Sequence, residues 1–133
     1  MSQYLLEVQG LKTYFFTRRG VVKAVDGVSF YVRERETLGL VGESGCGKSI
    51  TCLSVLRLVP EPAGKTVGGK VLLDGDDLFY KSEAEMRNIR GGKISIVLQD
   101  PLTSLNPAYS IGDQVAEAIA IHQKAKGKTL WQR

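Results

Sequence analysis

The sequence is poor in the features that mark membrane spans, metal centres and disulfide frameworks. Its apolar runs extend over only a few residues, far below the roughly 18 needed to cross a bilayer, and its start lacks the layout of a signal peptide. It has one histidine and two cysteines, Cys46 and Cys52. Neither a zinc site nor a disulfide framework is therefore indicated, and we expect reduced thiols.

Basic residues are scattered along the chain and form no continuous block. The formal net charge is +4, from 18 Lys and Arg against 14 Asp and Glu. Since a nucleic-acid site normally needs a basic patch or stripe, no nucleic-acid partner is predicted. The length of 133 residues and the hydrophobic content of 43% instead indicate one globular domain with one core.

The first part of the chain, residues 4–32, is typical of short β-strands joined by tight turns. Apolar residues cluster between the candidate turn glycines, which are Gly10, Gly20 and Gly27. The alternation of Val28, Phe30 and Val32 predicts one face of a strand with a period of two residues.

The central part predicts the order strand, glycine loop, helix. The apolar run Thr37–Val41 predicts a strand, and the helical spacing of apolar residues in Lys48–Leu58 predicts a helix that prolines then stop. After a Pro- and Gly-rich connector, Lys70–Leu73 predicts another strand. It turns at Asp74-Gly75, a dipeptide suited to the left-handed angles of a tight hairpin.

The last part predicts two helices around a buried strand. Ser82 can cap the first helix, with Glu85 completing a capping box, and this helix should end near Gly91-Gly92. Ile94–Leu98 predicts a buried strand. An amphipathic helix is predicted over Asp113–Gln123.

Two further segments of the last part are predicted without regular structure. A loop bounded by Pro101 and Pro107 precedes the last helix, and a polar, lysine-rich tail follows it. Prolines favour such boundaries because proline lacks a backbone donor and restricts the preceding residue.

The glycine loop Gly42–Ser49 reads GESGCGKS and carries the full pattern of a phosphate-binding loop. Phosphates need many donors at close range, and glycines let successive backbone amides point inward at the positive end of a helix. Lys48 supplies a charge for the β- and γ-phosphates, and Ser49 supplies a hydroxyl for a magnesium ion. The pattern predicts ATP binding with Mg²⁺, and a plain glycine turn with a solvated lysine is disfavoured.

Three other polar positions have structural as well as functional interpretations. Asp74 follows an apolar run, as a metal-binding acid would, but Gly75 makes a hairpin turn the simpler explanation. Cys46 is interpreted as a small loop residue rather than a redox centre. Gln99 follows the strand Ile94–Leu98, so its amide either reaches a metal or an attacking water or bonds to loop backbone.

Three segments resemble the ATP-binding subunits of ABC transporters: the loop GESGCGKS, the run QDPLTSLNP at Gln99–Pro107 and the upstream run LKTYFFTRRGVVKAVDGVSF. The particular resemblance is to the oligopeptide and dipeptide importer branch, which includes nickel importers, and it runs from about Leu5 to the helix near His122. It implies an α/β P-loop NTPase fold with an N-terminal antiparallel β subdomain and an incomplete parallel-sheet core. Residues 1–133 would then form an incomplete nucleotide-binding domain.

The resemblance implies site residues by position. Phe15 matches the A-loop aromatic residue that stacks on adenine, although Tyr14 and Phe16 flank it and core packing remains an alternative. Gln99 matches the Q-loop glutamine, so the implied catalytic residues are Lys48 and Gln99, and the implied metal ligands are Ser49 and Gln99. The implied ATP-binding residues are Phe15, Gly42, Glu43, Ser44, Gly45, Cys46, Gly47, Lys48, Ser49 and Ile50.

Two features depart from the family pattern. Ile50 stands where many relatives have threonine, so a hydroxyl contact to the α-phosphate is either missing or supplied by Thr51. The LSGGQ-type signature, the Walker B aspartate with its neighbouring glutamate and the switch histidine are not found in the 133 residues, and His122 is interpreted as a surface residue. We expect this chain alone to bind ATP weakly, to hydrolyse it negligibly and to be marginally stable or to recruit a second copy.

The resemblance implies an ATPase that energises the uptake of peptides or a related small solute. It would act at the cytoplasmic face of the membrane, with membrane subunits and a second ATP-binding subunit as partners. The alternative is a truncated, non-catalytic nucleotide-binding or interaction module. A P-loop kinase or GTPase is disfavoured, because the sequence has no Asn-Lys-x-Asp and no arginine-rich lid-like segment.

Overall fold

The computed structural model describes residues 3–99, 105–123 and 127, and the chain divides into two compact units, Met1–Ser82 and Glu83–Arg133. In chain order the elements are β1 (Leu6–Thr17), β2 (Gly20–Val32), α1 (Lys48–Val55), β3 (Gly64–Leu73), β4 (Asp76–Asp77), the 3-10 helix η1 (Leu78–Tyr80), α2 (Glu83–Ile89) and α3 (Ile111–Gln123). The predicted tail, apart from Gly127, and part of the predicted loop between Pro101 and Pro107 lie outside the described residues.

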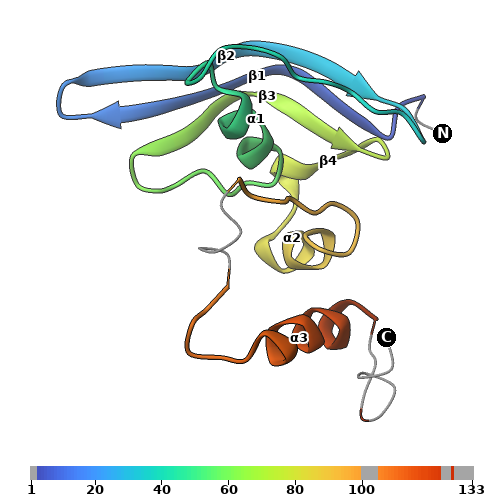
Figure 1. Ribbon diagram of the computed structural model, residues 1–133. Helices are drawn as coiled ribbons and strands as arrows, with labels where there is room; N and C mark the ends of the chain where they lie inside the picture. The colour runs from blue at the N-terminus through green and yellow to red at the C-terminus, as the bar shows by residue number, and fades with distance from the viewer. Residues whose placement is uncertain (1–2, 100–104, 124–126, 128–133) are drawn as a thin grey trace. The chain divides into compact units, whose positions relative to one another are not determined.

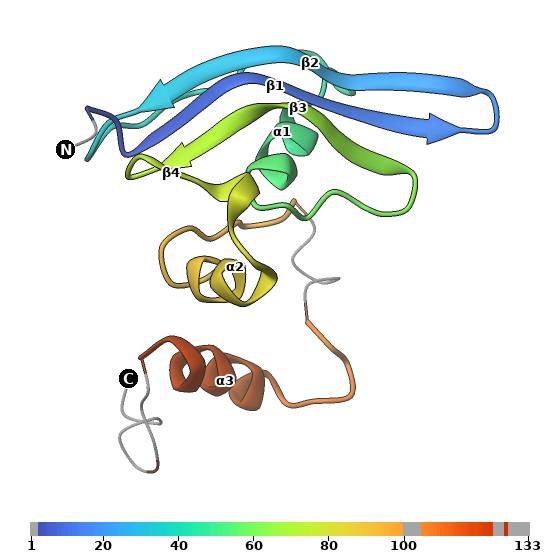
Figure 2. The ribbon, with the colours of Figure 1, turned by 180° about the vertical axis from the view of Figure 1, so that it is seen from behind.

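The first unit is an antiparallel sheet with a helix on one face. The strands lie in the order β2-β1-β3-β4, and α1 packs against β1 and β2 (Figures 1 and 2). β1 and β2 form a long hairpin whose turn, Arg18-Arg19, lies between the paired residues Thr17 and Gly20. The buried apolar residues of this unit are Val8, Leu11, Val25, Val55, Leu56, Val71, Leu73 and Leu78.

Two of the predicted turns are instead bulges within long strands. We expected tight turns at Gly10 and Gly27, but β1 and β2 pair on both sides of each glycine. Gly10 is an extra residue of β1, and Gly27 is an extra residue of β2; their φ angles are 55° and 84°. A glycine with positive φ can be absorbed as a bulge without ending the ladder. Gly20 does lie at a turn, as predicted.

The predicted face of β2 is confirmed. Val28, Phe30 and Val32 are half-buried, whereas Ser29 and Tyr31 between them are exposed. This is the alternation expected when one face of a strand is turned towards a core.

β3 is longer than the predicted strand Lys70–Leu73. It begins at Gly64, because its pairing with β1 extends over the preceding residues and tolerates their glycines. The hairpin after it is confirmed: Asp74 and Gly75 have φ angles of 52° and 87°. Both values lie in the left-handed region that a tight hairpin turn of this type requires.

α1 ends earlier than predicted, at Val55. Arg57 adopts a φ of 55°, and its amide donates to the Ser54 carbonyl at 3.1 Å, while the Leu58 amide donates to the Leu53 carbonyl at 2.8 Å. These two bonds and the left-handed residue form a Schellman motif, which ends the helix before the prolines are reached. The Arg57 side chain also donates to two carbonyl groups near η1.

The second unit contains the first of the two predicted C-terminal helices, α2. It ends at Ile89, close to the predicted end, and Gly91 follows it with a φ of 82°. A Cβ at Gly91 would lie 2.4 Å from Nε2 of His122, so the imidazole packs directly on this glycine. His122 is exposed, as predicted.

The second predicted helix is α3, which begins two residues earlier than expected, at Ile111. The cause is a cap: the Asp113 amide donates to Ser110 Oγ at 3.1 Å, and this hydroxyl donates to the Asp113 carboxylate at 2.7 Å. Among the described residues, no helix is both long enough and apolar enough to cross a membrane.

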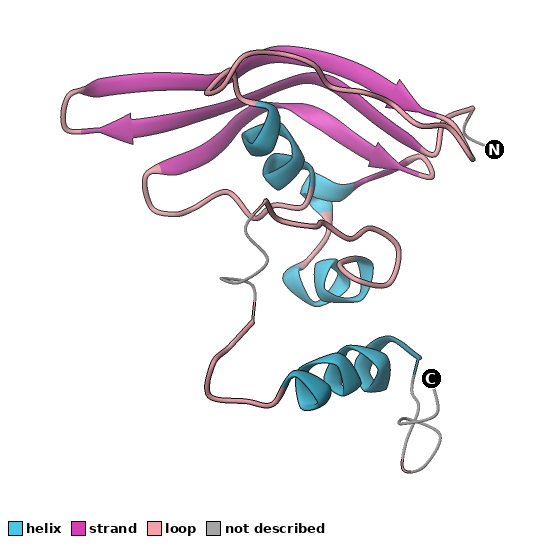
Figure 3. Ribbon diagram, in the orientation of Figure 1, coloured by secondary structure: helices cyan, strands magenta, loops and turns pink. Residues whose placement is uncertain are grey.

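Two predicted strands, Thr37–Val41 and Ile94–Leu98, are wrong as strands. Both segments run as loops (Figure 3), and Val41 and Val97 are 98% and 95% exposed. A strand of a parallel sheet needs neighbours to satisfy its backbone and cover its faces. Within the described ranges the only parallel pairing is an isolated bridge from Arg90 to Ile94, so the predicted parallel-sheet core forms no ladder there.

Candidate phosphate-binding site

The predicted phosphate-binding loop is curled rather than extended. It leads directly into α1, which begins at Lys48, and the Cys46 amide donates to the Glu43 carbonyl at 3.3 Å across the curve. Gly45 and Gly47 have φ angles of 81° and 94°, which glycine adopts at little steric cost. The glycine spacing therefore produces the curled backbone.

The Lys48 ammonium lies inside the curve of this loop. Nζ donates to the carbonyl oxygens of Gly42 and Glu43, both at 2.7 Å, and lies 3.4 Å from Cys46 Sγ. Its partners thus come from the beginning and the middle of the loop. They hold a positive charge where an anion bound to the loop amides would meet it.

Side chains at two of the loop glycines would meet close neighbours, a side chain at Gly42 and a fixed backbone at Gly47. A Cβ at Gly42 would lie 2.5 Å from Cys46 Sγ, and a Cβ at Gly47 would lie 2.2 Å from the carbonyl oxygen of Ala24 in β2. Ala24 is an extra residue of β2, because Thr13 pairs with Val25 and the next residue of β1 pairs with Lys23. The loop therefore rests directly on the backbone of a bulged strand.

The first turn of α1 supplies backbone donors to the same place. The first helical bond runs from the Thr51 amide to the Gly47 carbonyl at 2.8 Å, so the amides of Lys48, Ser49 and Ile50 precede the helical ladder. The first turn of α1 contains no acidic residue, and the positive end of the helix dipole is not neutralised there. The arrangement suits an anion.

Ser49 and Thr51 differ in how their hydroxyls are placed. Ser49 is exposed, so its hydroxyl is accessible to a ligand. Thr51 is only 5% exposed, and its hydroxyl donates to the Gly47 carbonyl at 2.9 Å. The Thr51 hydroxyl is thus bonded within the loop, and the two alternatives for the α-phosphate contact at Ile50 stay predictions.

Phe15 lies on the face of β1 that carries α1. Thr13, two positions earlier on the same face, forms a hydrogen bond with Ser54 of α1 at 2.7 Å. The Phe15 ring is half-buried, and a Cβ at Gly64 would lie 2.8 Å from its Cε1. One edge of the ring is thus packed in the structure, and part of it remains accessible.

Tyr14, the neighbour of Phe15, is engaged in a polar cluster. Its hydroxyl donates to Asp26 Oδ1 at 2.6 Å, and the Lys23 ammonium lies 5.3 Å from its ring centre. The hydrogen bond to Asp26 raises the pKa of Tyr14 and lowers the pKa of Asp26. The hydrogen bond to the same carboxylate raises the pKa of Lys23. Strand alternation places Tyr14 and Phe16 on the opposite face from Phe15.

The two predicted metal ligands belong to different units. Ser49 lies in the first unit, and Gln99, which is exposed, lies in the second. Across residues 3–99 and 105–123, no three His, Cys, Asp or Glu side chains gather in a way that suits a metal ion. A magnesium ion would therefore need oxygens from phosphate and water besides Ser49, and the role of Gln99 stays a prediction.

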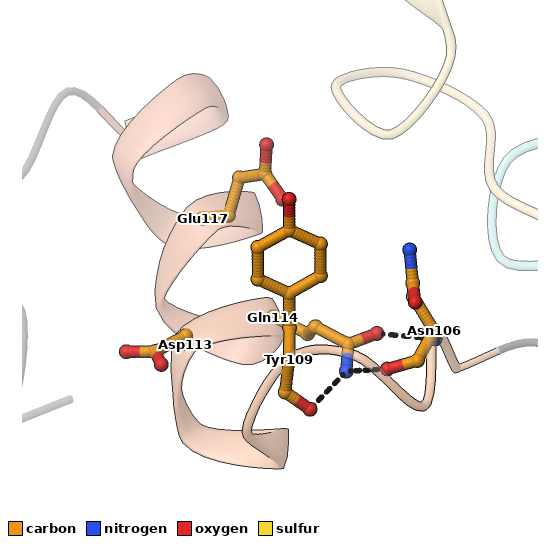
Figure 4. Close-up of a pocket in the computed structure, with 5 residues that line it drawn as sticks. All are labelled: Asn106, Tyr109, Asp113, Gln114 and Glu117. Atoms are coloured by element: carbon orange, nitrogen blue, oxygen red, sulfur yellow. Dashed lines mark hydrogen bonds between the residues drawn. The ribbon is translucent and has the colours of Figure 1, made fainter.

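A pocket of about 400 Å³ in the second unit contains none of the predicted site residues. It is lined by Asn106, Tyr109, Asp113, Gln114 and Glu117 (Figure 4). The Gln114 amide accepts from the Asn106 amide at 2.8 Å and donates to the carbonyls of Asn106 and Tyr109 at 2.9 and 3.2 Å. These bonds tie the preceding loop to α3, which explains the polar lining by local structure.

Sequence reasoning missed a set of buried hydroxyls beneath α1. Thr13 and Ser54 are fully buried, and Thr66 lies 3.4 Å from Thr13. In the part of the chain that the structure describes, no buried side-chain oxygen or nitrogen lacks a hydrogen-bond partner. One feature of the sequence could have indicated these hydroxyls. Thr13 lies between Leu11 and Phe15, on the face of a strand where apolar residues were expected.

Most of the chain matches one known protein family. The family profile described as ABC transporter matches residues 25–132. The chain belongs to the ABC transporter family. The matched range includes the whole loop Gly42–Ser49 and also Gln99, whereas Phe15 precedes it.

Curated proteins of peptide transport are among the relatives of this ABC transporter chain. The probable peptide ABC transporter ATP-binding protein y4tR of Sinorhizobium fredii is 51% identical over 121 residues, which are 91% of this chain and 36% of that protein. The oligopeptide transport ATP-binding protein AppD of Bacillus subtilis is 46% identical over 129 residues, which are 97% of this chain and 39% of AppD. The chain thus spans less than two fifths of the length of these relatives.

Solved structures support the fold of an ABC ATPase cassette. The cassette MJ0796, in a dimeric post-hydrolysis state bound to ADP and Pi, gives a TM-score of 0.81 at 20% identity over 96% of this chain and 53% of its own. A second dimeric structure of MJ0796 gives a TM-score of 0.76 at 22% identity, over 92% and 49%. The predicted α/β P-loop class is thereby confirmed.

Proposed function

We propose that the loop Gly42–Ser49 binds the phosphates of ATP. The observation that carries this proposal is the position of the Lys48 ammonium, inside a curled loop at the N-terminal end of α1 and 2.7 Å from the carbonyls of Gly42 and Glu43. Phosphate oxygens carry more negative charge than carbonyl oxygens, so Lys48 gains stronger hydrogen bonds by exchanging these partners for a triphosphate. The amides that precede the helical ladder add donors to the same anion.

The residues present fit a triphosphate with a magnesium ion. Since side chains at Gly42 and Gly47 would collide with Cys46 and with Ala24, the loop keeps backbone where phosphates must approach closely. The exposed Ser49 hydroxyl would enter the magnesium shell, and a bound magnesium ion would neutralise phosphate charge. We assign phosphate binding to the residues Gly42, Glu43, Ser44, Gly45, Cys46, Gly47, Lys48, Ser49 and Ile50.

Phe15 is the proposed platform for adenine. It lies on the α1 face of β1, and its ring is half-buried and partly accessible. Its packing over Gly64 would hold the ring in place while a flat base stacks on the accessible part. Tyr14 is a weaker candidate, because its hydroxyl is bonded to Asp26 on the other face of the strand.

The wider role that we propose is that of an importer ATPase for peptides or a related small solute. Support comes from relatives that are ATP-binding proteins of peptide and oligopeptide transport and from the dimeric state of the cassette MJ0796. The proposed partners are membrane subunits and a second ATP-binding subunit, at the cytoplasmic face of the membrane. Gln99 would approach the magnesium ion and the attacking water and would link this site to the membrane subunits.

Calorimetric titration of the 133-residue chain with ATP and Mg²⁺ tests the proposal. We expect Lys48→Ala to abolish detectable binding, because it removes the charge at the centre of the loop. The matched control is Lys70→Ala, which removes an exposed lysine of β3 and should leave affinity unchanged. Equal affinity of the Lys48→Ala variant and the unsubstituted chain would contradict the proposal.

A further inference from the structure

We infer that Thr13 and Ser54 are positioning residues that set the adenine platform at the correct distance from the phosphate-binding loop. The inference rests on the proposed function and adds to it the device that holds the two halves of the nucleotide site in register. Neither residue touches a nucleotide in this proposal. They act through the elements that carry them, β1 and α1.

The hydroxyls form a directed chain from the sheet into the first turn of α1. Ser54 Oγ donates to the Ile50 carbonyl at 2.6 Å, so its proton is committed, and Thr13 must be the donor in the 2.7 Å contact with Ser54. Thr66 of β3 lies 3.4 Å from Thr13 Oγ1 and can supply the next proton. The chain therefore ends on Ile50, the residue that follows Ser49.

This chain of hydroxyls is not needed to fill the core. Thr13 and Ser54 are both 0% exposed, and burying a hydroxyl carries a desolvation penalty. Val and Ala at these positions would occupy nearly the same volume, and replacing both partners by apolar groups is often close to neutral for stability. What apolar contact does not supply is direction, because a hydrogen bond depends on distance and angle.

The two ends of the chain lie next to the two halves of the proposed site. Phe15 follows Thr13 by two positions on the same face of β1, and β1 pairs without interruption from Thr13 to Phe15 with the β3 residues Thr66 to Gly64. At the other end, Ile50 lies in the first turn of α1, directly after the loop. Adenine and triphosphate are parts of one ligand, so a slip of α1 along β1 would spoil their simultaneous fit.

Separate ligands for the two halves make the inference testable. Thr13→Val removes the donor and keeps the shape, and affinities are measured by calorimetry for ATP and for inorganic tripolyphosphate, each with Mg²⁺. We expect ATP affinity to fall about five- to tenfold, the size of one net hydrogen bond. Affinity for tripolyphosphate should stay within about twofold, because the loop, Lys48 and the Gly47 contact are untouched.

Three further variants separate positioning from stability. Thr13→Ser keeps the hydroxyl and should restore ATP affinity. Thr13→Val combined with Ser54→Ala should bring the melting temperature back towards that of the unsubstituted chain while ATP affinity stays low. Ser29→Ala removes another hydroxyl of the same hairpin, one that accepts from the Gly10 amide at 2.8 Å, and should change neither affinity.

The outcomes distinguish this inference from the proposed function. In a Phe15→Ala background, Thr13→Val should cause no further loss of ATP affinity. If Thr13→Val weakens ATP and tripolyphosphate equally, or weakens neither, the inference is overturned and the proposed function stands. If the unsubstituted chain binds neither ligand, the proposed function fails and the inference fails with it.

Discussion

Apolar segments of this chain that look alike in sequence have opposite fates in the structure. In β3, Val71 and Leu73 are 0% and 5% exposed, whereas Val41 and Val97, in segments that were also predicted as strands, are 98% and 95% exposed. The difference lies in their neighbours. β3 pairs with β1, while the other two segments gain no ladder in the described residues. An apolar run becomes a strand only where a neighbouring strand satisfies its backbone.

The largest predicted effect comes from truncating a side chain in the paired region. Leu11 in β1 is 0% exposed, so Leu11→Ala should lower the free energy of unfolding by about 2–5 kcal/mol. Urea denaturation measures the change. The matched control is Val97→Ala, at a 95% exposed position, which should alter stability by no more than about 0.5 kcal/mol. Equal losses of stability in Leu11→Ala and Val97→Ala would contradict the view that the paired strands carry the core and that the segment around Val97 does not.

An intermediate effect is expected from glycines within the paired strands. Gly69 has a φ of 94°, and a Cβ there would lie 2.6 Å from Leu11 Cα. Because backbone cannot move aside, Gly69→Ala should cost about 3 kcal/mol. Gly10 has a φ of 55°, and a Cβ there would have no other atom within 4 Å, so Gly10→Ala should cost only about 1 kcal/mol. Urea denaturation measures both changes in the free energy of unfolding. A larger loss of stability in Gly10→Ala than in Gly69→Ala would contradict the interpretation of Gly10 as an open bulge.

The smallest effect concerns the exposed face of the same hairpin. Asp26→Asn removes the carboxylate that raises the pKa of Tyr14, so Tyr14 should titrate at lower pH in the variant, as followed by NMR. Since the folded pKa of Tyr14 is raised, its contribution to stability is present at neutral pH and is lost as pH rises through that pKa. The contribution of Asp26, whose folded pKa is lowered, is lost as pH falls through its own folded pKa.

The control for this titration is Glu7→Gln. Glu7 is an acid of β1 that is bonded to Gln9 at 2.8 Å and does not belong to the Tyr14 cluster. The Glu7→Gln substitution should leave the pKa of Tyr14 unchanged. A Tyr14 pKa that does not respond to Asp26→Asn would mean that the hydrogen bond is not populated in solution.

Elements that depend on nearby residues could be predicted from the sequence. The turn at Asp74-Gly75, the helices α2 and α3 and the alternating face of β2 were all predicted close to their observed positions. Turn geometry, caps and hydrophobic period act over a few residues, so a local pattern contains the needed information. The early end of α1 was missed, because Arg57 occupies a left-handed position that glycine usually marks.

The candidate site shows the same division between local and distant information. The loop Gly42–Ser49 was recognised because phosphate chemistry demands glycines and a lysine at fixed local spacing. The close contact between the loop and the backbone of Ala24 was not predicted, because it depends on a bulge in β2 and on how closely the loop approaches that strand.

By itself, the sequence determined the loop motif, the family resemblance and the hairpin with its helices, since each rests on neighbouring residues. Tertiary structure alone decided which apolar runs became strands and how the hydroxyls beneath α1 pair. Thr13 and Ser54 lie 41 positions apart, and a hydrogen bond over that separation exists only once the chain has folded. Its distance and direction belong to the packed elements, and no spacing rule along the chain contains them.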